Sequence, residues 1–387
     1  MELFIDTFFE NATALRWEQS AADIVDLDLI ADHARMSPNR QMTWWNFKIH
    51  TSPAARGGQL RLRFRPVTSC WNGTPAPALR RDPLTSVVSA EGRAWRVLPV
   101  CPSTEAGFVK ELCVPIEGSC MHVAHLVPYN DSDLQATLAQ LQGGPEVRIY
   151  QLGATVEGRP LEMVEIGAPE APGRVLFRGR AHPWETGGSW LLEGLMRFLV
   201  SPAAADLRRR LCVCIMPMAN KDGVARGLSR FTVTGMDLNR GWFANQPHDP
   251  VLCPENACLD AWLAQQQRLG RLPRLAICLH NDDGGNLHFS HPGREGEGHA
   301  RRMDLFEGLL RDLTWFREGR AAAGFVNSGT FGEGLCEQYG IDALIYELRA
   351  CWAAGLNRTP MPDDWLGLGR DLAFVLDRFF ATVDHGK

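Results

Sequence analysis

The stretch Val175-Leu176-Phe177-Arg178-Gly179-Arg180-Ala181-His182-Pro183-Trp184-Glu185 joins a short apolar run to a polar cluster. The apolar run and the helical pattern that follows at residues 189–200 are typical of a buried strand that leads into a helix. Similar apolar runs occur at residues 211–217, 275–279 and 343–346, with a further helical stretch at 258–269. This alternation predicts an α/β fold with a mixed, largely parallel sheet flanked by helices.

Polar residues follow each of these four runs. His182 and Glu185 follow the first run, and residues 220–223 (Asn-Lys-Asp-Gly) follow the second. His280 closes the third run, and Glu347 closes the fourth. In open α/β sheets, ligands bind beyond the carboxyl ends of the strands. We therefore expect the four clusters to converge on one site, although they lie far apart in the sequence.

The first third of the chain has a different pattern. Apolar and polar residues alternate at 45–49 and again at 60–64, and Gly57-Gly58 lies between the two segments. Alternation with a period of two predicts strands with one buried face, and the glycine pair predicts a turn. We expect a small antiparallel β-sandwich in residues 1–127 and the α/β domain in residues 128–387.

Composition argues against several classes of protein. The chain has 387 residues, enough for two domains, and a net charge of −5, which disfavours a nucleic-acid scaffold held by phosphate contacts. No apolar run approaches the roughly 18 residues of a membrane span, and we expect no secretory signal at the acidic N-terminus. The eleven cysteines, an odd number without a C-x-x-C pair, favour reduced thiols and a cytoplasmic protein.

Histidine and glutamate at the strand ends suggest a metal site. His182 and Glu185 can point at one ion from a strand-to-helix turn, and His280 would complete a His₂Glu set that leaves zinc an open position. A surface pair is the alternative for the first two residues. Two other H-x-x-H pairs compete: His122 with His125, which a strand would send to opposite faces, and His288 with His291 in a Gly/Pro-rich loop. We interpret the first pair as structural and the second as loop or rim residues.

Other polar residues could act on a substrate. Glu347 could serve as a general base or could be a buried carboxylate paired with Arg349. Asn239 and Arg240 lie side by side in Gly235-Met236-Asp237-Leu238-Asn239-Arg240, ten residues after Arg230. An arginine fork and an amide could grip a carboxylate or an oxyanion, although a single arginine is more often a surface ion pair.

These motifs resemble those of the zinc metallocarboxypeptidases of the carboxypeptidase A superfamily, and the likeness is greatest to the cytosolic carboxypeptidase branch. The matching order is H-x-x-E at 182–185, N-x-D-G-V at 220–224 with Arg230, G-x-D-x-N-R at 235–240, then His280 and Glu347. Residues 128–134 resemble the start of the catalytic domain in that branch. The chain departs from the branch at Trp184, where glycine is usual, and at Lys221, where proline is usual. A substrate-contacting tyrosine cannot be assigned.

The resemblance implies a role for each motif residue. His182, Glu185 and His280 would bind one Zn²⁺, and Glu347 would act as general base and acid toward a zinc-activated water. Asn239 and Arg240 would hold the terminal carboxylate of a peptide or protein tail, and Arg230 would stabilise the oxyanion. The implied activity is that of a zinc metallocarboxypeptidase, a hydrolase. Two alternatives remain open: a zinc amidase of the same fold acting on N-acyl amino acids, and an inactive zinc-binding interaction protein.

Overall fold

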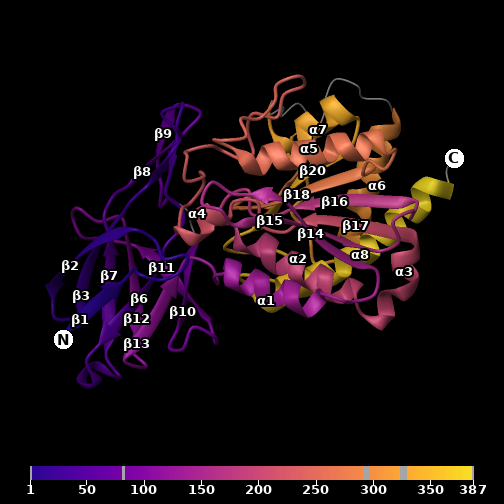
Figure 1. Cartoon of the computed structure of the whole chain (residues 1–387). Helices are drawn as coiled ribbons and strands as arrows, with labels where there is room; N and C mark the ends of the chain where they lie inside the picture. Colours follow the sequence, from indigo (N-terminus) through magenta and orange to yellow (C-terminus); the bar gives the residue numbers. More distant parts are fainter. Residues whose placement is uncertain (1, 81–82, 291–296, 323–328, 386–387) are drawn as a thin grey trace. The chain divides into compact units, whose positions relative to one another are not determined.

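The computed structural model describes residues 2–80, 83–290, 297–322 and 329–385, and it divides the chain into two compact units (Figure 1). The first unit comprises Met1–Asn130 and Asp222–Met236, and the second comprises Asp131–Lys221 and Asp237–Lys387. The sequence boundary at residue 127 stays a prediction. The segment Asp222–Met236, which includes Arg230, belongs to the first unit even though it lies between two strands of the second.

A nine-stranded sheet forms most of the first unit. Its neighbours pair antiparallel, except for β3 and β7, which run parallel. Along β7 the side chains of Leu60, Leu62 and Phe64 are fully buried, as the alternating pattern predicts. In spatial order the strands are β1 (Leu3–Asp6), β6 (Asn46–Thr51), β13 (Cys120–Ala124), β10 (Leu84–Ser89), β11 (Arg96–Pro102), β12 (Lys110–Pro115), β7 (Gln59–Phe64), β3 (Ile24–Leu29) and β2 (Leu15–Ala21).

A second, small sheet belongs to the same unit. Its four strands pair antiparallel, and a short 3₁₀ helix, η1 (Pro53–Ala55), lies elsewhere in the unit. We expected a small antiparallel β-sandwich here, and an N-terminal domain of mostly antiparallel sheet is confirmed. The strands of the small sheet are, in order, β4 (Asp32–His33), β5 (Arg40–Gln41), β8 (Thr68–Trp71) and β9 (Thr74–Pro77).

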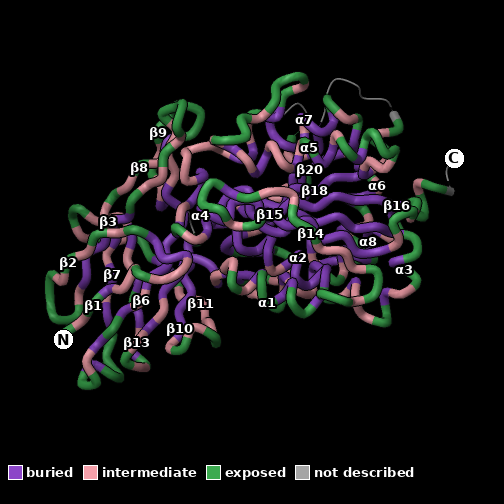
Figure 2. Tube along the Cα trace, in the orientation of Figure 1, coloured by how far each residue is buried: buried purple, intermediate pink, exposed green. Residues whose placement is uncertain are grey.

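The second unit is built on a seven-stranded mixed sheet. The four strands β17, β16, β18 and β20 run parallel, and β14, β15 and β19 are antiparallel to their neighbours. Every residue of β16 and β17 is buried, as the purple strands of Figure 2 show. The predicted mixed, largely parallel α/β sheet is thus confirmed. In spatial order the strands are β14 (Val147–Ala154), β15 (Pro160–Ile166), β17 (Leu211–Met216), β16 (Gly173–Arg178), β18 (Leu275–Asp282), β20 (Asp342–Arg349) and β19 (Leu287–Phe289).

Helices cover both faces of this sheet. Figure 1 shows α2 and α8 on one face and α5 and α7 on the other. Glycine permits the close approach of α2 and α8, because a Cβ at Gly194 would lie 2.1 Å from the carbonyl oxygen of Leu366. The helices are α1 (Asp131–Leu141), α2 (Thr186–Leu199), α3 (Ala205–Arg210), α4 (Lys221–Ala225), α5 (Pro254–Arg268), α6 (Glu297–Leu313), α7 (Phe331–Tyr339) and α8 (Pro362–His385), with a 3₁₀ turn η2 (Pro202–Ala204).

Two further observations concern the chain as a whole. Among the described residues, no helix combines the length and the apolar character that crossing a membrane requires. All eleven cysteines lie in the described part of the chain, and none of them forms a disulfide bond there.

Candidate functional site

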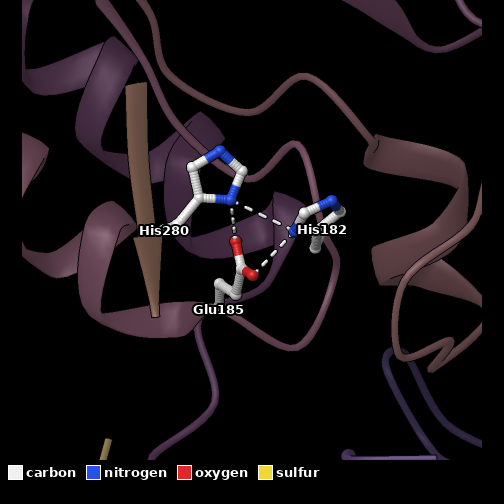
Figure 3. A group of neighbouring side chains, drawn as sticks. All are labelled: His182, Glu185 and His280. Atoms are coloured by element: carbon white, nitrogen blue, oxygen red, sulfur yellow. Dashed lines mark hydrogen bonds and ion pairs between the residues drawn. The ribbon is translucent and has the colours of Figure 1, made fainter. Parts of the chain in front are cut away.

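Three side chains of the second unit converge where the sequence predicted a metal site (Figure 3). The Nδ1 atom of His182 lies 2.7 Å from Oε1 of Glu185, and the Nδ1 atom of His280 lies 2.9 Å from Oε2 of the same carboxylate. The two Nδ1 atoms are 3.1 Å apart. All three residues are buried, so these contacts lie in a region with little water.

The backbone explains how residues so far apart in sequence meet. His182 and Glu185 lie in the turn between the end of β16 and the start of α2, whereas His280 lies near the carboxyl end of β18. Strands β16 and β18 are parallel neighbours, so their carboxyl ends lie at the same edge of the sheet. The turn itself passes through Arg180, whose φ of 54° is in the left-handed region, and this conformation redirects the chain after the strand.

Each histidine has a different partner on its other ring nitrogen. The Nε2 atom of His182 lies 3.2 Å from Oδ1 of Asp237, which can accept a hydrogen bond from Nε2–H and leave the Nδ1 lone pair facing Glu185 and His280. The Nε2 atom of His280 lies 3.2 Å from Sγ of Cys278. Burial raises the pKa of Cys278 to about 12, so this partner is a neutral thiol. The Nε2 atom of His182 therefore faces a carboxylate, whereas the Nε2 atom of His280 faces a neutral thiol, which is a weaker hydrogen-bonding partner.

The donor set fits a divalent cation of the zinc type. Two imidazole nitrogens and one carboxylate are the ligands of many catalytic zinc sites, which keep a further position open for water. The ligand atoms of His182, Glu185 and His280 all lie within 4.8 Å of one another. A cation among them would offset the carboxylate charge and would give both Nδ1 lone pairs a shared partner.

Glu347 lies on the strand next to His280. The two residues are paired in the register between β18 and β20, which places them on the same face of the sheet. The carboxylate of Glu347 also lies within 4.8 Å of ligand atoms of Asp282 and His288. His288, which we expected to be a loop or rim residue, belongs to strand β19 and not to a loop. Burial lowers the pKa of His288, although the nearby Asp282 acts in the opposite direction.

Asn239 and Arg240 lie in the loop that also carries Asp237. The side-chain oxygen of Asn239 accepts a hydrogen bond from the N–H of Phe331 at 3.0 Å, so its amide NH₂ is the part suited to a ligand. The Nη1 atom of Arg240 donates to the carbonyl oxygen of Asn239 at 2.8 Å. Asn239 is buried and Arg240 is half-buried.

A buried arginine that the sequence analysis did not single out supports this loop. The side chain of Arg178, at the end of β16, is completely buried, and its Nη1 atom donates to the carbonyl oxygen of Leu238 at 3.0 Å. Its other terminal nitrogen donates to Oδ1 of Asn256 at 2.5 Å, and Nε1 of Trp242 donates to the same Leu238 oxygen at 3.0 Å. The sequence did contain a signal for this residue, because Arg178 is a charged residue at the end of an apolar strand.

Arg230 belongs to the first unit, and its described contacts lie there. Its backbone N–H donates to Oδ2 of Asp32 at 2.8 Å, and its guanidinium carbon lies 4.2 Å from the ring centre of Trp71. Burial raises the pKa of Asp32, an effect that outweighs the hydrogen bonds from the N–H groups of Phe231 and Arg230. Arg230 is only 7% exposed.

The competing residues make other contacts. His125 stacks on Trp45 with ring centres 4.4 Å apart, and His122 packs edge-on against Trp95, which agrees with a structural interpretation of this pair. His291 lies outside the described residues. Tyr346 is buried, as are the three candidate metal ligands.

Comparison with known proteins supports the resemblance. Residues 134–263 match the model of the zinc carboxypeptidase family. Cytosolic carboxypeptidase 6 of Mus musculus is 30% identical over 265 residues, which are 63% of this chain and 47% of the relative. The human protein of the same name is also 30% identical, over 50% of its length. The chain thus spans about half the length of the curated relatives it matches.

Solved structures share the fold of the whole chain. A metallo-carboxypeptidase from Burkholderia cenocepacia has a TM-score of 0.82 and 22% identity, and the match covers 99% of this chain and 100% of that one. A metallo-carboxypeptidase from Pseudomonas aeruginosa in complex with (2-guanidinoethylmercapto)succinic acid has a TM-score of 0.80 and 20% identity, over 98% and 99% of the two chains. At these identities the likeness establishes the fold alone. The resemblance that the motifs predicted is confirmed, since residues 134–263 match the zinc carboxypeptidase family and the matching relatives include cytosolic carboxypeptidases.

Proposed function

We propose that the protein is a zinc-dependent metallocarboxypeptidase that hydrolyses the C-terminal peptide bond of peptides or protein tails, and the match of residues 134–263 to the zinc carboxypeptidase family supports this proposal. The observation that carries this proposal is the convergence of two Nδ1 atoms and one carboxylate within 3.1 Å of one another. Cytosolic carboxypeptidases among the relatives support a cytoplasmic location. The proposed partner is the substrate tail, with neither nucleic acid nor membrane involved.

The proposed zinc ligands are His182, Glu185 and His280. When bound, Zn²⁺ supplies a Lewis acid and lowers the pKa of a coordinated water toward neutrality. The chain would contribute the orientation of the ligands: Asp237 would accept a hydrogen bond from Nε2–H of His182 and so leave the Nδ1 lone pair available to the metal. Burial of all three ligands lowers the local dielectric constant, which would strengthen their attraction for a cation.

Glu347 is the proposed general base and acid. Its place beside His280 in the β18–β20 register supports this role, because the carboxylate then extends from the same face of the sheet as a metal ligand. It would take a proton from the attacking water and deliver that proton to the leaving amine. Positioned proton transfer of this kind contributes roughly 10²–10⁴-fold to a reaction rate.

Asn239, Arg240 and Arg230 are the proposed substrate groups. The guanidinium of Arg240 and the amide NH₂ of Asn239 would bind the terminal carboxylate, for which a planar arginine fork is well suited. Arg230 would stabilise the negative charge that develops on the scissile carbonyl oxygen. Its motif position after N-x-D-G-V supports this assignment.

A substrate panel tests the proposal against a same-fold amidase. Peptides that differ only in the last residue and N-acylated single amino acids are incubated with zinc-loaded protein, and the released amino acids are measured by mass spectrometry. Release of the last residue from peptides, faster than hydrolysis of N-acyl amino acids, is expected. Glu347→Gln should slow release by at least ~10²–10⁴-fold, whereas Glu337→Gln, on the exposed surface of α7, should leave the rate unchanged. Hydrolysis of only N-acyl amino acids would replace the proposal with an amidase, and no hydrolysis at all would favour an inactive zinc-binding protein.

A further inference from the structure

The four-stranded sheet of the first unit contains a hairpin that presents an aromatic ring. Strands β8 and β9 are joined by Asn72 and Gly73, which have φ angles of 47° and 77°. Two consecutive residues with positive φ form the tight turn that matches the twist of a hairpin, and Asn-Gly is its preferred sequence. The N–H of Gly73 also donates to Oδ1 of Asn39 at 3.1 Å. The turn thus fixes Trp71, the last residue of β8.

The ring of Trp71 lies against Arg230. The guanidinium carbon of Arg230 is 4.2 Å from the ring centre, a distance at which the positive charge is attracted to the electron-rich face. The Nη1 atom of Arg230 also lies 3.4 Å from Oε1 of Gln41, which is part of β5 in the same sheet. Two strands of the small sheet therefore contact one guanidinium group.

Hydrogen bonds to residues 32–44 hold the backbone around Arg230. The N–H groups of Arg230 and Phe231 donate to Oδ2 of Asp32 at 2.8 and 2.7 Å. Oγ of Ser229 accepts hydrogen bonds from the N–H groups of Thr43 and Trp44 at 2.9 and 3.1 Å. These bonds hold the backbone of Arg230, but they do not by themselves set the orientation of its guanidinium group. Contacts at the guanidinium itself are needed to set that orientation.

Trp71 is poorly suited to a purely structural role. Its side chain is 41% exposed, whereas Trp44 and Trp45 of the same unit are almost fully buried in the core. An exposed tryptophan adds little to the apolar core, and the face of this ring lies against the guanidinium of Arg230.

We propose that Trp71 is a positioning residue that holds the guanidinium of Arg230 in its working orientation, with Gln41 as a second support. This inference rests on the proposed function, in which Arg230 stabilises the developing oxyanion. The proposal gives the four-stranded sheet a role, because its residues Trp71 and Gln41 would orient Arg230. Because Arg230 would act mainly on charge that develops in the transition state, Trp71 should affect kcat more than KM.

Kinetics of three variants test the proposal. Trp71→Ala should lower kcat by roughly 2- to 30-fold, the range expected for loss of a cation–π contact, with KM nearly unchanged. Trp71→Phe keeps an aromatic face and should restore most of kcat. Trp17→Ala is the matched control, because it removes a partly exposed tryptophan of the large sheet that packs against Phe4. Equal losses in Trp71→Ala and Trp17→Ala, or a loss confined to KM, would overturn the proposal.

A double-mutant cycle separates positioning from general destabilisation. In an Arg230→Ala background, Trp71→Ala should have no further effect on kcat, because the group that it orients is absent. The same kcat ratio for Trp71→Ala in both backgrounds would contradict the inference.

A spectroscopic measurement decides the orientation without enzyme activity. The Nε–H resonance of Arg230, assigned by its loss in Arg230→Lys, should be shifted by the ring of Trp71 and should lose that shift in Trp71→Ala. An unchanged resonance would overturn the proposal even in an active enzyme. Failure of the wild type to hydrolyse any substrate would instead overturn the proposed function, and the resonance would still show whether Trp71 orients Arg230.

Discussion

The Nδ1 atoms of His182 and His280 lie 3.1 Å apart across a separation of 98 residues in the sequence. Two neutral imidazoles cannot hydrogen-bond through two lone pairs, so a close approach of these atoms favours a shared cation. The carboxylate of Glu185 lies within 2.9 Å of both nitrogens and supplies the negative charge that such a cation needs. This arrangement leads to predictions for each contributing residue.

Zinc content tests the ligand assignment. The purified protein should contain about one zinc per chain, and His280→Ala or Glu185→Ala should lower that occupancy, because catalytic sites keep three protein ligands. Metal analysis by mass spectrometry after dialysis measures the effect. Full zinc occupancy in both variants would show that other residues bind the metal.

Asp237 should affect metal affinity although it is not a ligand. Asp237→Asn removes the charge that the Nε2–H of His182 faces, and loss of such a partner typically weakens zinc binding by roughly 10- to 100-fold. Competition with a fluorescent chelator measures the affinity. Asp206→Asn, an exposed change on α3, is the control and should leave it unaltered. Equal affinities in Asp237→Asn and the wild type would argue that the contact does not orient the imidazole.

Glu347→Gln should separate metal binding from turnover. The amide keeps the shape of the side chain but cannot accept and return a proton, so kcat should fall by at least ~10²–10⁴-fold while zinc content stays the same. Parallel assays of metal content and kcat check both parts. Near-normal turnover would assign Glu347 to a structural ion pair instead.

The ion-pair cluster at the start of β20 should make stability depend on pH. Burial raises the pKa of Asp342, but hydrogen bonds from His299 and Arg302 outweigh that effect and hold the pKa below its usual 3.8. The folded state then binds fewer protons than the unfolded state, so this contribution is present above pH 3.8 and is lost as the pH falls through the lower folded-state pKa.

Replacement of Asp342 checks the sign of this effect. Asp342→Asn should lower the free energy of unfolding by about 1–2 kcal/mol at pH 7, the scale of a partly buried charged hydrogen bond. Urea unfolding at several pH values should show that the difference from the wild type shrinks in acid. A difference that grows on acidification would contradict the assignment.

The strand ends were the most predictable part of the molecule. Buried parallel strands are marked by continuous apolar runs, and polar residues just after such runs must lie at one edge of the sheet. This reasoning from sequence anticipated the meeting of His182, Glu185 and His280, whose ligand atoms do lie together. The hairpin at Asn72-Gly73 carried an equally strong signal, which the sequence analysis did not use.

Side-chain contacts that depend on tertiary packing could not be predicted from the sequence. Nothing in a single sequence pairs Nε2 of His182 with Asp237 or joins the Arg178 side chain to the carbonyl oxygen of Leu238, because many polar residues compete for each partner. The place of Asp222–Met236 in the first unit was also not foreseen. Local patterns predict strands and turns, but they do not specify which unit a connecting segment joins.

The comparison of free and amidated peptides tests the central claim most directly. If Arg240 and Asn239 grip a terminal carboxylate, amidation should lower kcat/KM by roughly 30- to several-thousand-fold, because a buried charged pair loses one partner (~2–5 kcal/mol). In Arg240→Lys the ratio of kcat/KM for the free peptide to kcat/KM for the amidated peptide should fall toward one, since an ammonium cannot reproduce the bidentate fork. Arg268→Lys, on the exposed surface of α5, should preserve it. Equal cleavage of free and amidated peptides by the wild type would contradict the account and would point to an internal peptidase or a general amidase.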